Sequence, residues 1–328
     1  MSLSLRLARL GMRAILRPLL ARARAVRLLR GIVWAGGLAM LPVRGTRRRA
    51  WSGPVPGTEF LPADMQPVPV ILWFHGGGYV AGSPFTHRGL LARIARAARV
   101  RVIAPDYRLA PEHPGGAAFD DGLACVRALI ERGLAPGDLI LGGDSAGGGL
   151  AAAVTAALCA SGQPPGGLIG LSPWTDMTGS GASHRENGKR DDMLPAERLG
   201  DLVNLVRGPL PPDDPRLSPV FARFPGLPRA YLSVGAEEIL RDDMQRLATR
   251  LARDGARVTA RVQPGAPHVL AFLAPVVPEA RAEIRRIGRW IVNPATLAFI
   301  LPEISHGGCG GVKPPPPPIP RGPRSADN

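Results

Sequence analysis

The sequence predicts an α/β fold in which helices cover both faces of a mostly parallel central sheet. From Pro69 onward, short apolar runs alternate with longer stretches that carry apolar residues at helical spacing. This alternation is typical of parallel sheets, because each crossover between parallel strands needs a long connection, usually a helix. The composition, 45% hydrophobic and 20% charged, is typical of soluble globular proteins and argues against a disordered chain.

The individual elements follow from the same pattern. We expect strands at Val70–Phe74, Arg101–Ala104, Leu139–Gly142, Leu168–Leu171, Ala230–Val234 and Val258–Val262. We expect helices at Thr86–Ala98, Ala117–Glu131, Ala146–Ala160, Asp242–Asp254 and Glu279–Trp290. The Gly- and Pro-rich region 173–228 interrupts this order with one helical patch at Ala196–Val206, and we interpret it as an insertion over one end of the sheet.

Positive charge is concentrated near the N-terminus. The first fifty residues contain twelve arginines, the first acidic residue is Glu59, and the formal net charge of the chain is +15. The basic residues are almost all Arg, which indicates a base-composition bias of the gene, so we exclude nucleic acid as a partner. Cys125, Cys159 and Cys309 lie far apart, so we expect neither a disulfide framework nor a metal site. We also expect no cofactor.

The N-terminal segment has the pattern of one or two basic amphipathic helices, with Arg6, Arg9, Arg13 and Arg17 at helical spacing among leucines. The apolar run Gly31–Met40 is shorter than the roughly 20 residues that a spanning helix needs, and no clear signal-peptide cleavage site follows it. We therefore expect a cytoplasmic protein. Weak association of residues 1–50 with the inner membrane surface stays open. The oligomeric state stays open as well, with a homodimer as one alternative.

A candidate nucleophile, Ser145, lies in the segment G-D-S-A-G at residues 143–147, which has the form G-x-S-x-G. The segment follows an apolar run and precedes an Ala-rich helical run, which is the strand-turn-helix context that the motif needs. A serine hydroxyl is a strong nucleophile only when it is exposed beside a base, and small flanking residues permit the sharp turn that exposes it. The pentapeptide alone also fits a phosphate-binding turn.

A second glycine-rich turn, His75-Gly76-Gly77-Gly78, follows the expected strand Val70–Phe74. Glycines at a strand end let backbone N–H groups turn toward a substrate oxygen and stabilise its developing negative charge. We expect the N–H groups of Gly77, Gly78 and Ala146 to form this oxyanion hole. The two glycine motifs at successive strand ends favour a serine hydrolase over two unrelated turns.

These two motifs, together with D-Y-R-L-A-P-E-H-P at residues 106–114, closely resemble the hormone-sensitive-lipase-like (family IV) bacterial esterases of the α/β-hydrolase superfamily. The resemblance covers about Pro69–Trp290. It implies an α/β-hydrolase fold with a helical cap, and carboxylesterase activity on short and medium acyl chains. The expected organisation is a basic helical N-terminal cap segment at 1–60, core at 61–172, cap insertion at 173–228, core at 229–292, and a disordered Pro-rich tail at 293–328.

The remaining catalytic residues are expected after Ser145 in the order acid, then histidine. His268 follows the expected strand Val258–Val262, in a Gly- and Pro-containing loop that we expect to expose its imidazole at the sheet end, so we assign it as the general base. The resemblance favours Glu238 as the acid, although many relatives have Asp there. Glu237 remains an alternative, and we interpret Asp242 and Asp243 as residues that bind free N–H groups of their own helix start.

The predicted function is hydrolysis of small-molecule carboxylic esters through Ser145, His268 and Glu238, with an acyl-enzyme intermediate. Two alternatives remain open. The same site also suits an acyltransferase or a lactonase, because the second nucleophile depends on what reaches the pocket. From a different class, the chain also fits a membrane-surface binding protein with an inactive hydrolase core.

Overall fold

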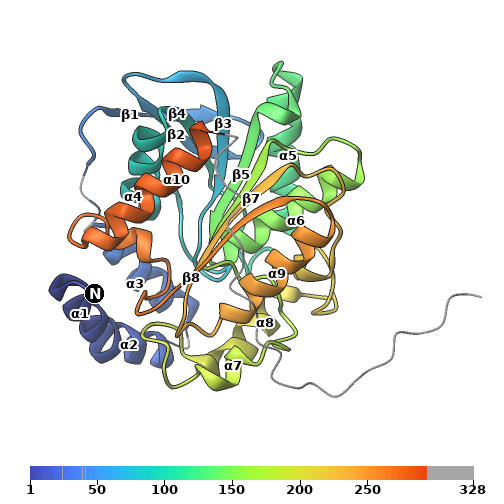
Figure 1. The fold of residues 1–328 in the computed structure, drawn as a ribbon. Coiled ribbons are helices and arrows are strands. Elements are labelled where there is room, and N and C mark those ends of the chain that lie inside the picture. The colour runs from blue at the N-terminus through green and yellow to red at the C-terminus, as the bar shows by residue number, and fades with distance from the viewer. Residues whose placement is uncertain (24, 39, 41, 294–328) are drawn as a thin grey trace, which may run out of the picture.

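The computed structural model describes residues 1–293 except 24, 39 and 41, and it is built around one twisted sheet (Figure 1). The strands are β1 (Thr46–Ser52), β2 (Pro56–Pro62), β3 (Gln66–Phe74), β4 (Val100–Pro105), β5 (Leu139–Asp144), β6 (Gly167–Leu171), β7 (Arg229–Gly235) and β8 (Arg257–Gln263). The described strands form an eight-stranded sheet in the order β1-β2-β4-β3-β5-β6-β7-β8. β1 and β2 are antiparallel to their neighbours, and the other pairs are parallel. The predicted mostly parallel α/β sheet is confirmed.

The helices connect the strands or cover one end of the sheet. They are α1 (Leu3–Gly11), a π-helical turn (Met12–Leu16), α2 (Arg17–Arg22), α3 (Val26–Leu38), α4 (Pro84–Ala98), α5 (Ala117–Glu131), α6 (Ala146–Ala160), α7 (Ser183–Glu186), α8 (Leu199–Arg207), α9 (Arg241–Arg253) and α10 (Pro278–Val292). Each helix expected after Pro69 is present, although the ends of several differ from the expected ones by a few residues. None of the described helices is both long and apolar enough to cross a membrane.

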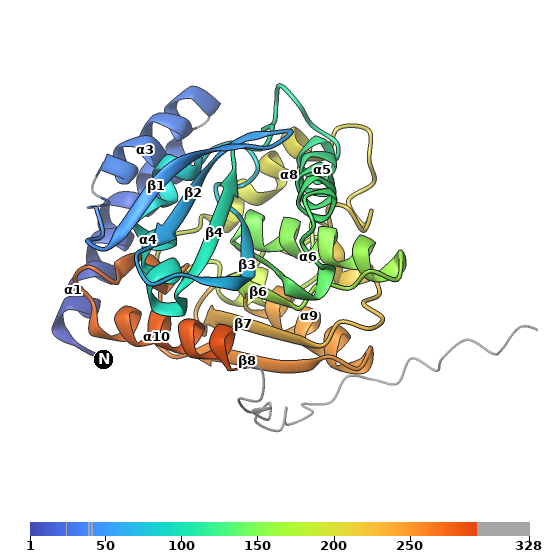
Figure 2. The same ribbon diagram turned by 90° about the horizontal axis from the view of Figure 1, so that it is seen from above.

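Helices cover both faces of the sheet (Figure 2), and an apolar core lies between the helices and the sheet on each face. Side chains of α5, α6 and α9 pack against one face, and those of α4 and α10 pack against the other. The central strands are buried on both sides, as the run Ile71, Leu72, Trp73 and Phe74 in β3 illustrates, since each of these side chains is fully buried. Burial on both faces explains why these strands appear in the sequence as continuous apolar runs.

The strands β1 and β2 were not predicted. They fall in or directly after the segment 1–60, which was expected to be a helical cap segment. The helices of this segment end at Leu38, and residues 46–52 and 56–62 join the sheet. β1 is an edge strand whose Arg47, Arg48 and Arg49 are exposed, so it has no alternation of apolar and polar residues. The expected tail lies, apart from Asn293, outside the described residues.

The N-terminal helices and the insertion lie together at the end of the sheet where β5 meets α6 (Figure 1). Arg9 forms an ion pair with Asp192 at 2.5 Å, and Arg17 donates to the Gly188 carbonyl at 2.8 Å. In the other direction, Arg198 of the insertion donates to the Ala21 carbonyl at 2.9 Å. Several arginines of the basic segment are therefore used to attach it to the rest of the protein.

We expect Leu72→Ala to lower the free energy of unfolding by about 2–5 kcal/mol, because it leaves a cavity in the middle of β3. Met65→Ala is the matched control, since the Met65 side chain is 43% exposed and its removal should change stability by less than about 0.5 kcal/mol. Urea unfolding followed by circular dichroism measures both values. Equal effects of the two substitutions would contradict the position of Leu72 in the core.

Candidate active site

Ser145 lies at a sharp turn between β5 and α6. Its backbone has φ 53° and ψ −125°, a conformation that costs energy for any residue with a side chain. The Ser145 N–H donates to the Leu171 carbonyl at 2.8 Å, and its own carbonyl accepts from Trp174 N at 2.9 Å. These bonds fix the turn to the end of β6, so the hydroxyl keeps a defined position at the sheet end.

The glycines that flank Ser145 are required by close backbone contacts. A Cβ at Gly147 would lie 2.1 Å from the Phe74 carbonyl oxygen and 2.4 Å from that of His75. A Cβ at Gly143 would lie 2.1 Å from the Gly147 carbonyl oxygen. The turn therefore brings α6 and the end of β3 so close that no side chain fits between them, which explains the spacing of the G-x-S-x-G motif.

His268 and Glu238 form a buried hydrogen-bonded pair. The distance from His268 Nδ1 to Glu238 Oε2 is 2.6 Å, and both side chains are almost completely buried. The second carboxylate oxygen of Glu238 accepts hydrogen bonds from Gly235 N at 2.6 Å and from the Ser172 hydroxyl at 2.8 Å. Ser172 in turn accepts from Val269 N at 3.0 Å, so the same hydroxyl connects the acid to the histidine loop.

The alternative acid and the two aspartates have other partners. Glu237 accepts a hydrogen bond from Gly265 N at 3.0 Å and does not bond to His268. Asp243 is fully buried and accepts from Thr175 N and Asp176 N, both at 2.9 Å. Asp242 likewise accepts from Ser183 N. Both aspartates lie in the first turn of α9, as expected, but the N–H groups that they bind belong to the insertion and not to their own helix. Both hold the insertion against α9, because its polar backbone needs partners where it is buried.

The charge on Glu238 controls the protonation of His268. Burial by itself disfavours the imidazolium, but the charge of Glu238, the hydrogen bond to it and the more distant Asp191 and Asp144 outweigh this effect. The pKa of His268 is consequently raised above its ordinary value of 6.5. A histidine with these partners has its Nδ1 proton held by the carboxylate, which leaves Nε2 as the basic nitrogen.

The glycine-rich turn after β3 is held by a buried network around Asp144. Asp144 accepts hydrogen bonds from Trp73 Nε1 at 3.0 Å and Gly76 N at 3.2 Å, and its Oδ2 lies 3.1 Å from His87 Nε2. Burial opposes the charge on Asp144, yet attraction to His87 and these bonds lower its pKa overall. Asp144 thereby joins the turn that carries Ser145 to the turn that carries the glycines.

The expected oxyanion donors lie beside this network. Within the described residues, neither Gly77 nor Gly78 donates its N–H group to a protein acceptor. Ala146 is the first residue of α6, where an N–H group has no partner inside the helix. Gly77 and Gly78 have φ of 123° and 64°, so the turn that presents their N–H groups is accessible to glycine but strained for other residues.

His75, the first residue of the glycine-rich turn, is a structural residue. It is fully buried and stacks on the Tyr107 ring with 4.2 Å between ring centres. Burial, with a smaller contribution from the charge of His87, lowers the pKa of His75 to about 3. The imidazole is therefore neutral over the range in which most enzymes work, and it supports the turn by packing.

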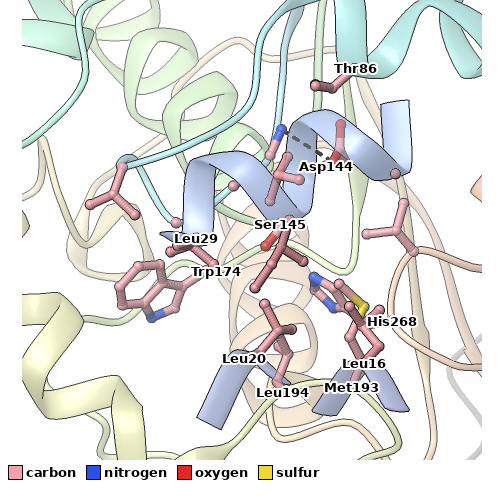
Figure 3. Close-up of a pocket in the computed structure, with 18 of the residues that line it drawn as sticks. Leu16, Leu20, Leu29, Thr86, Asp144, Ser145, Trp174, Met193, Leu194 and His268 are labelled. Carbon is pink, nitrogen blue, oxygen red and sulfur yellow. Dashed lines mark hydrogen bonds between the residues drawn. The ribbon is translucent and has the colours of Figure 1, made fainter. Parts of the chain in front are cut away.

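Ser145, His268 and the glycine-rich turn line one large cavity of about 470 Å³ (Figure 3). Its wall is mainly apolar and comes from the N-terminal helices, the insertion and the core, for example Leu16, Leu20, Leu29, Trp174, Met193 and Leu194. This cover also buries His268, which is only 5% exposed, so the expectation of an exposed imidazole was wrong. Among the described residues, no group of His, Cys, Asp and Glu is arranged to hold a metal ion.

The structure brings together the residues that the sequence suggested. They are Ser145, His268 and Glu238, with the oxyanion donors Gly77, Gly78 and Ala146. It adds residues that sequence analysis missed, namely His87, Asp144, Ser172 and Asp191. Asp144 stands inside the G-D-S-A-G motif, and that place was its only signal in the sequence. The others carry no motif, because their roles depend on contacts with residues far away along the chain.

Comparisons with known proteins agree with this architecture. Residues 71–272 match a family model described as alpha/beta hydrolase fold. The chain is 38% identical over 222 residues to an acetyl-hydrolase of Streptomyces hygroscopicus, which covers 67% of this chain and 74% of that protein. A solved esterase from the bacterial hormone-sensitive lipase family is 36% identical with a TM-score of 0.81, and covers 89% of this chain and 98% of that one.

A second solved structure, EstE5 soaked with p-nitrophenyl butyrate, is 30% identical with a TM-score of 0.84, and covers 89% of this chain and 98% of that one. The chain belongs to the α/β-hydrolase fold family, in its bacterial hormone-sensitive-lipase-like branch of esterases.

Proposed function

We propose that this protein is a serine carboxylesterase that hydrolyses esters of short to medium acyl chains through Ser145, His268 and Glu238. The observation that carries the proposal is the buried bond of 2.6 Å between His268 and Glu238, next to a serine on a strained turn in the same apolar cavity. A base oriented by a third group beside a nucleophile that the substrate can reach is the arrangement that acyl transfer needs.

In the first half of the reaction, His268 Nε2 accepts the Ser145 proton as the hydroxyl oxygen attacks the ester carbonyl carbon. The carbonyl oxygen becomes negatively charged and is stabilised by the N–H groups of Gly77, Gly78 and Ala146. Glu238 stabilises the imidazolium that forms. His268 then donates the proton to the leaving alcohol, the carbon–oxygen bond to the alcohol breaks, and the acyl group stays on Ser145.

In the second half, His268 removes a proton from water, which attacks the acyl-enzyme and releases the acid. The bond between Ser145 and the acyl carbon breaks, and Ser145 recovers its proton from His268. The two halves of the reaction need only the side chains and N–H groups named here, together with water. The buried Ser172 hydroxyl keeps Glu238 in place throughout, because it bonds both the acid and the loop that carries His268.

The substrate class follows from the cavity. A volume of about 470 Å³ is in the range of small-molecule sites, and its apolar wall favours an acyl chain over a charged or sugar-like group. The names of two relatives support esters with small acyl groups: one is an acetyl-hydrolase, and EstE5 was soaked with p-nitrophenyl butyrate. We propose acetyl to octanoyl esters as the preferred substrates.

Ser145→Ala is expected to lower the rate of p-nitrophenyl butyrate hydrolysis by about 10⁴-fold or more, because it removes the nucleophile. The measurement compares p-nitrophenyl acetate, butyrate, octanoate and palmitate for the wild type and the variant. We expect the wild type to be slowest on palmitate. Full activity of the variant would contradict the assignment, and a wild type without activity on any of these esters would favour an inactive core.

Glu238→Gln is expected to lower kcat by about 10²–10⁴-fold, because a neutral amide neither holds the imidazole tautomer nor stabilises the imidazolium. Glu237→Gln is the matched control and should change kcat only a few-fold, since Glu237 bonds to Gly265 and not to His268. Steady-state kinetics on p-nitrophenyl butyrate measures both. A larger loss for Glu237→Gln would make Glu237 the acid.

The pH profile of kcat/KM should rise with pH, with a midpoint above 6.5, because His268 must be neutral to act as base and its pKa is raised. In Glu238→Gln the attraction that favours the imidazolium is lost while the burial stays. The pKa of His268 then falls, so the residual activity should persist to lower pH. A midpoint that does not move in this variant, or that moves equally in Glu237→Gln, would be inconsistent with the His268–Glu238 pair.

A further inference from the structure

The first helix presents leucines to the solvent. Leu3, Leu7 and Leu10 of α1 are 71%, 59% and 64% exposed, and their spacing of four and three residues places them on one face. The helices of a soluble domain normally place polar residues on the outward face. On the inward side of α1, Leu5 is buried, so the helix has apolar residues on both sides.

The same feature continues along the N-terminal segment. More than half of the large apolar side chains that are exposed in the described residues fall within the first 38 positions. Besides those of α1 they include Ile15, Leu19, Leu28, Trp34 and Leu38. A concentration of this kind is unusual for a protein surface and indicates that something covers it.

The arginines of these helices divide into two groups. Arg9, Arg17 and Arg30 bind other parts of the protein, namely Asp192, the Gly188 carbonyl and Glu112. By contrast, Arg6, Arg22 and Arg27 are exposed, and within the described part of the chain their side chains have no hydrogen bond or ion pair. We call these three arginines and the exposed apolar residues of α1, the π-helical turn, α2 and α3 the outer N-terminal face.

We propose that the outer N-terminal face binds the surface of an anionic lipid membrane. Exposed leucines and a tryptophan beside unpaired arginines are the features of helices that lie in the plane of a bilayer surface, where apolar side chains enter the acyl boundary and arginines meet lipid phosphates. No acidic residue precedes Glu59, so the face has no carboxylate of its own to neutralise it.

A second copy of the chain fits this face less well. Two such faces in contact would bring two sets of unpaired arginines together, and like charges in a partly dry interface repel. Nucleic acid fits less well too, because the exposed positions are mainly leucines, which do not bind phosphates. Charge and apolarity together therefore favour lipid.

The opposite sides of the π-helical turn, α2 and α3 line the catalytic cavity. Met12, Leu16, Leu20 and Leu29 belong to its wall, whereas Leu3, Leu7, Leu10 and Trp34 do not. Membrane binding would therefore place the cover of the cavity at the lipid surface without rearranging its lining. The binding does not depend on the proposed ester hydrolysis and is measured separately from it.

The exposed Trp34 is a fluorescent probe of lipid binding by this face. Trp34 is 54% exposed, while the other tryptophans of the chain, Trp51, Trp73, Trp174 and Trp290, are at most 5% exposed. Transfer of Trp34 into the lipid boundary should shift the tryptophan emission to shorter wavelength when vesicles of phosphatidylglycerol and phosphatidylcholine are added. Trp34→Phe should keep the binding but lose the shift, because it retains an apolar ring.

The test is co-sedimentation of the full chain with these anionic vesicles and with phosphatidylcholine alone. We expect binding to the anionic vesicles only, weakened by salt, and reduced about tenfold or more in the variant Arg6→Glu/Arg22→Glu/Arg27→Glu. The matched control, Arg127→Glu/Arg253→Glu/Arg257→Glu, changes the net charge equally at exposed positions elsewhere and should bind like the wild type. Leu3→Ser/Leu7→Ser/Leu10→Ser should also bind at least about tenfold more weakly.

Three results would overturn the proposal. One is equal sedimentation with neutral and anionic vesicles, and another is equal binding by the two charge variants. The third is a dimer in analytical ultracentrifugation that the triple serine variant dissociates, since a second copy would then cover the face. Circular dichroism of each variant checks that it is folded. Because the substituted positions are exposed, we expect every variant to fold, so that lost binding reports on the face itself.

Discussion

The close approach of α6 to the end of β3 is the constraint on which the site depends. A Cβ at Gly147 would lie only 2.1 Å from the Phe74 carbonyl oxygen, so a side chain at this position would push the two elements apart. The contact forces Ser145 into its strained turn and places the glycine-rich turn beside it. A small distance between two backbones therefore sets the geometry of both the proposed nucleophile and its oxyanion donors.

Buried carboxylates keep that geometry fixed. Asp144 binds the glycine-rich turn and His87, Glu238 binds the histidine loop through Ser172, and Asp243 holds the insertion. Each buried charge has several partners, which a charge removed from water requires. Because every one of these bonds joins segments that are distant in the sequence, loss of one partner should affect alignment of the site as well as stability.

The N-terminal segment has two sides with different surroundings in this structure. Its inner side completes the wall of the cavity, and three of its arginines attach it to the insertion and to the core. Its outer side keeps leucines and three unpaired arginines in the solvent. The high net charge thus divides into a structural part and an exposed part, a division that composition alone does not reveal.

Local sequence determined much of this protein: the parallel sheet from its apolar runs, Ser145 and the glycine turn from their motifs, and His268 from its place after the last strand. Tertiary structure decided what depends on contacts across the chain. In the folded chain Glu238, and not Glu237, bonds to His268, while His87 bonds to Asp144 and Ser172 bonds to Glu238. The strands β1 and β2 join the sheet, and the N-terminal helices bury His268. Motifs and periodicity record a residue's neighbours along the chain, whereas these pairings depend on how strand ends meet in space.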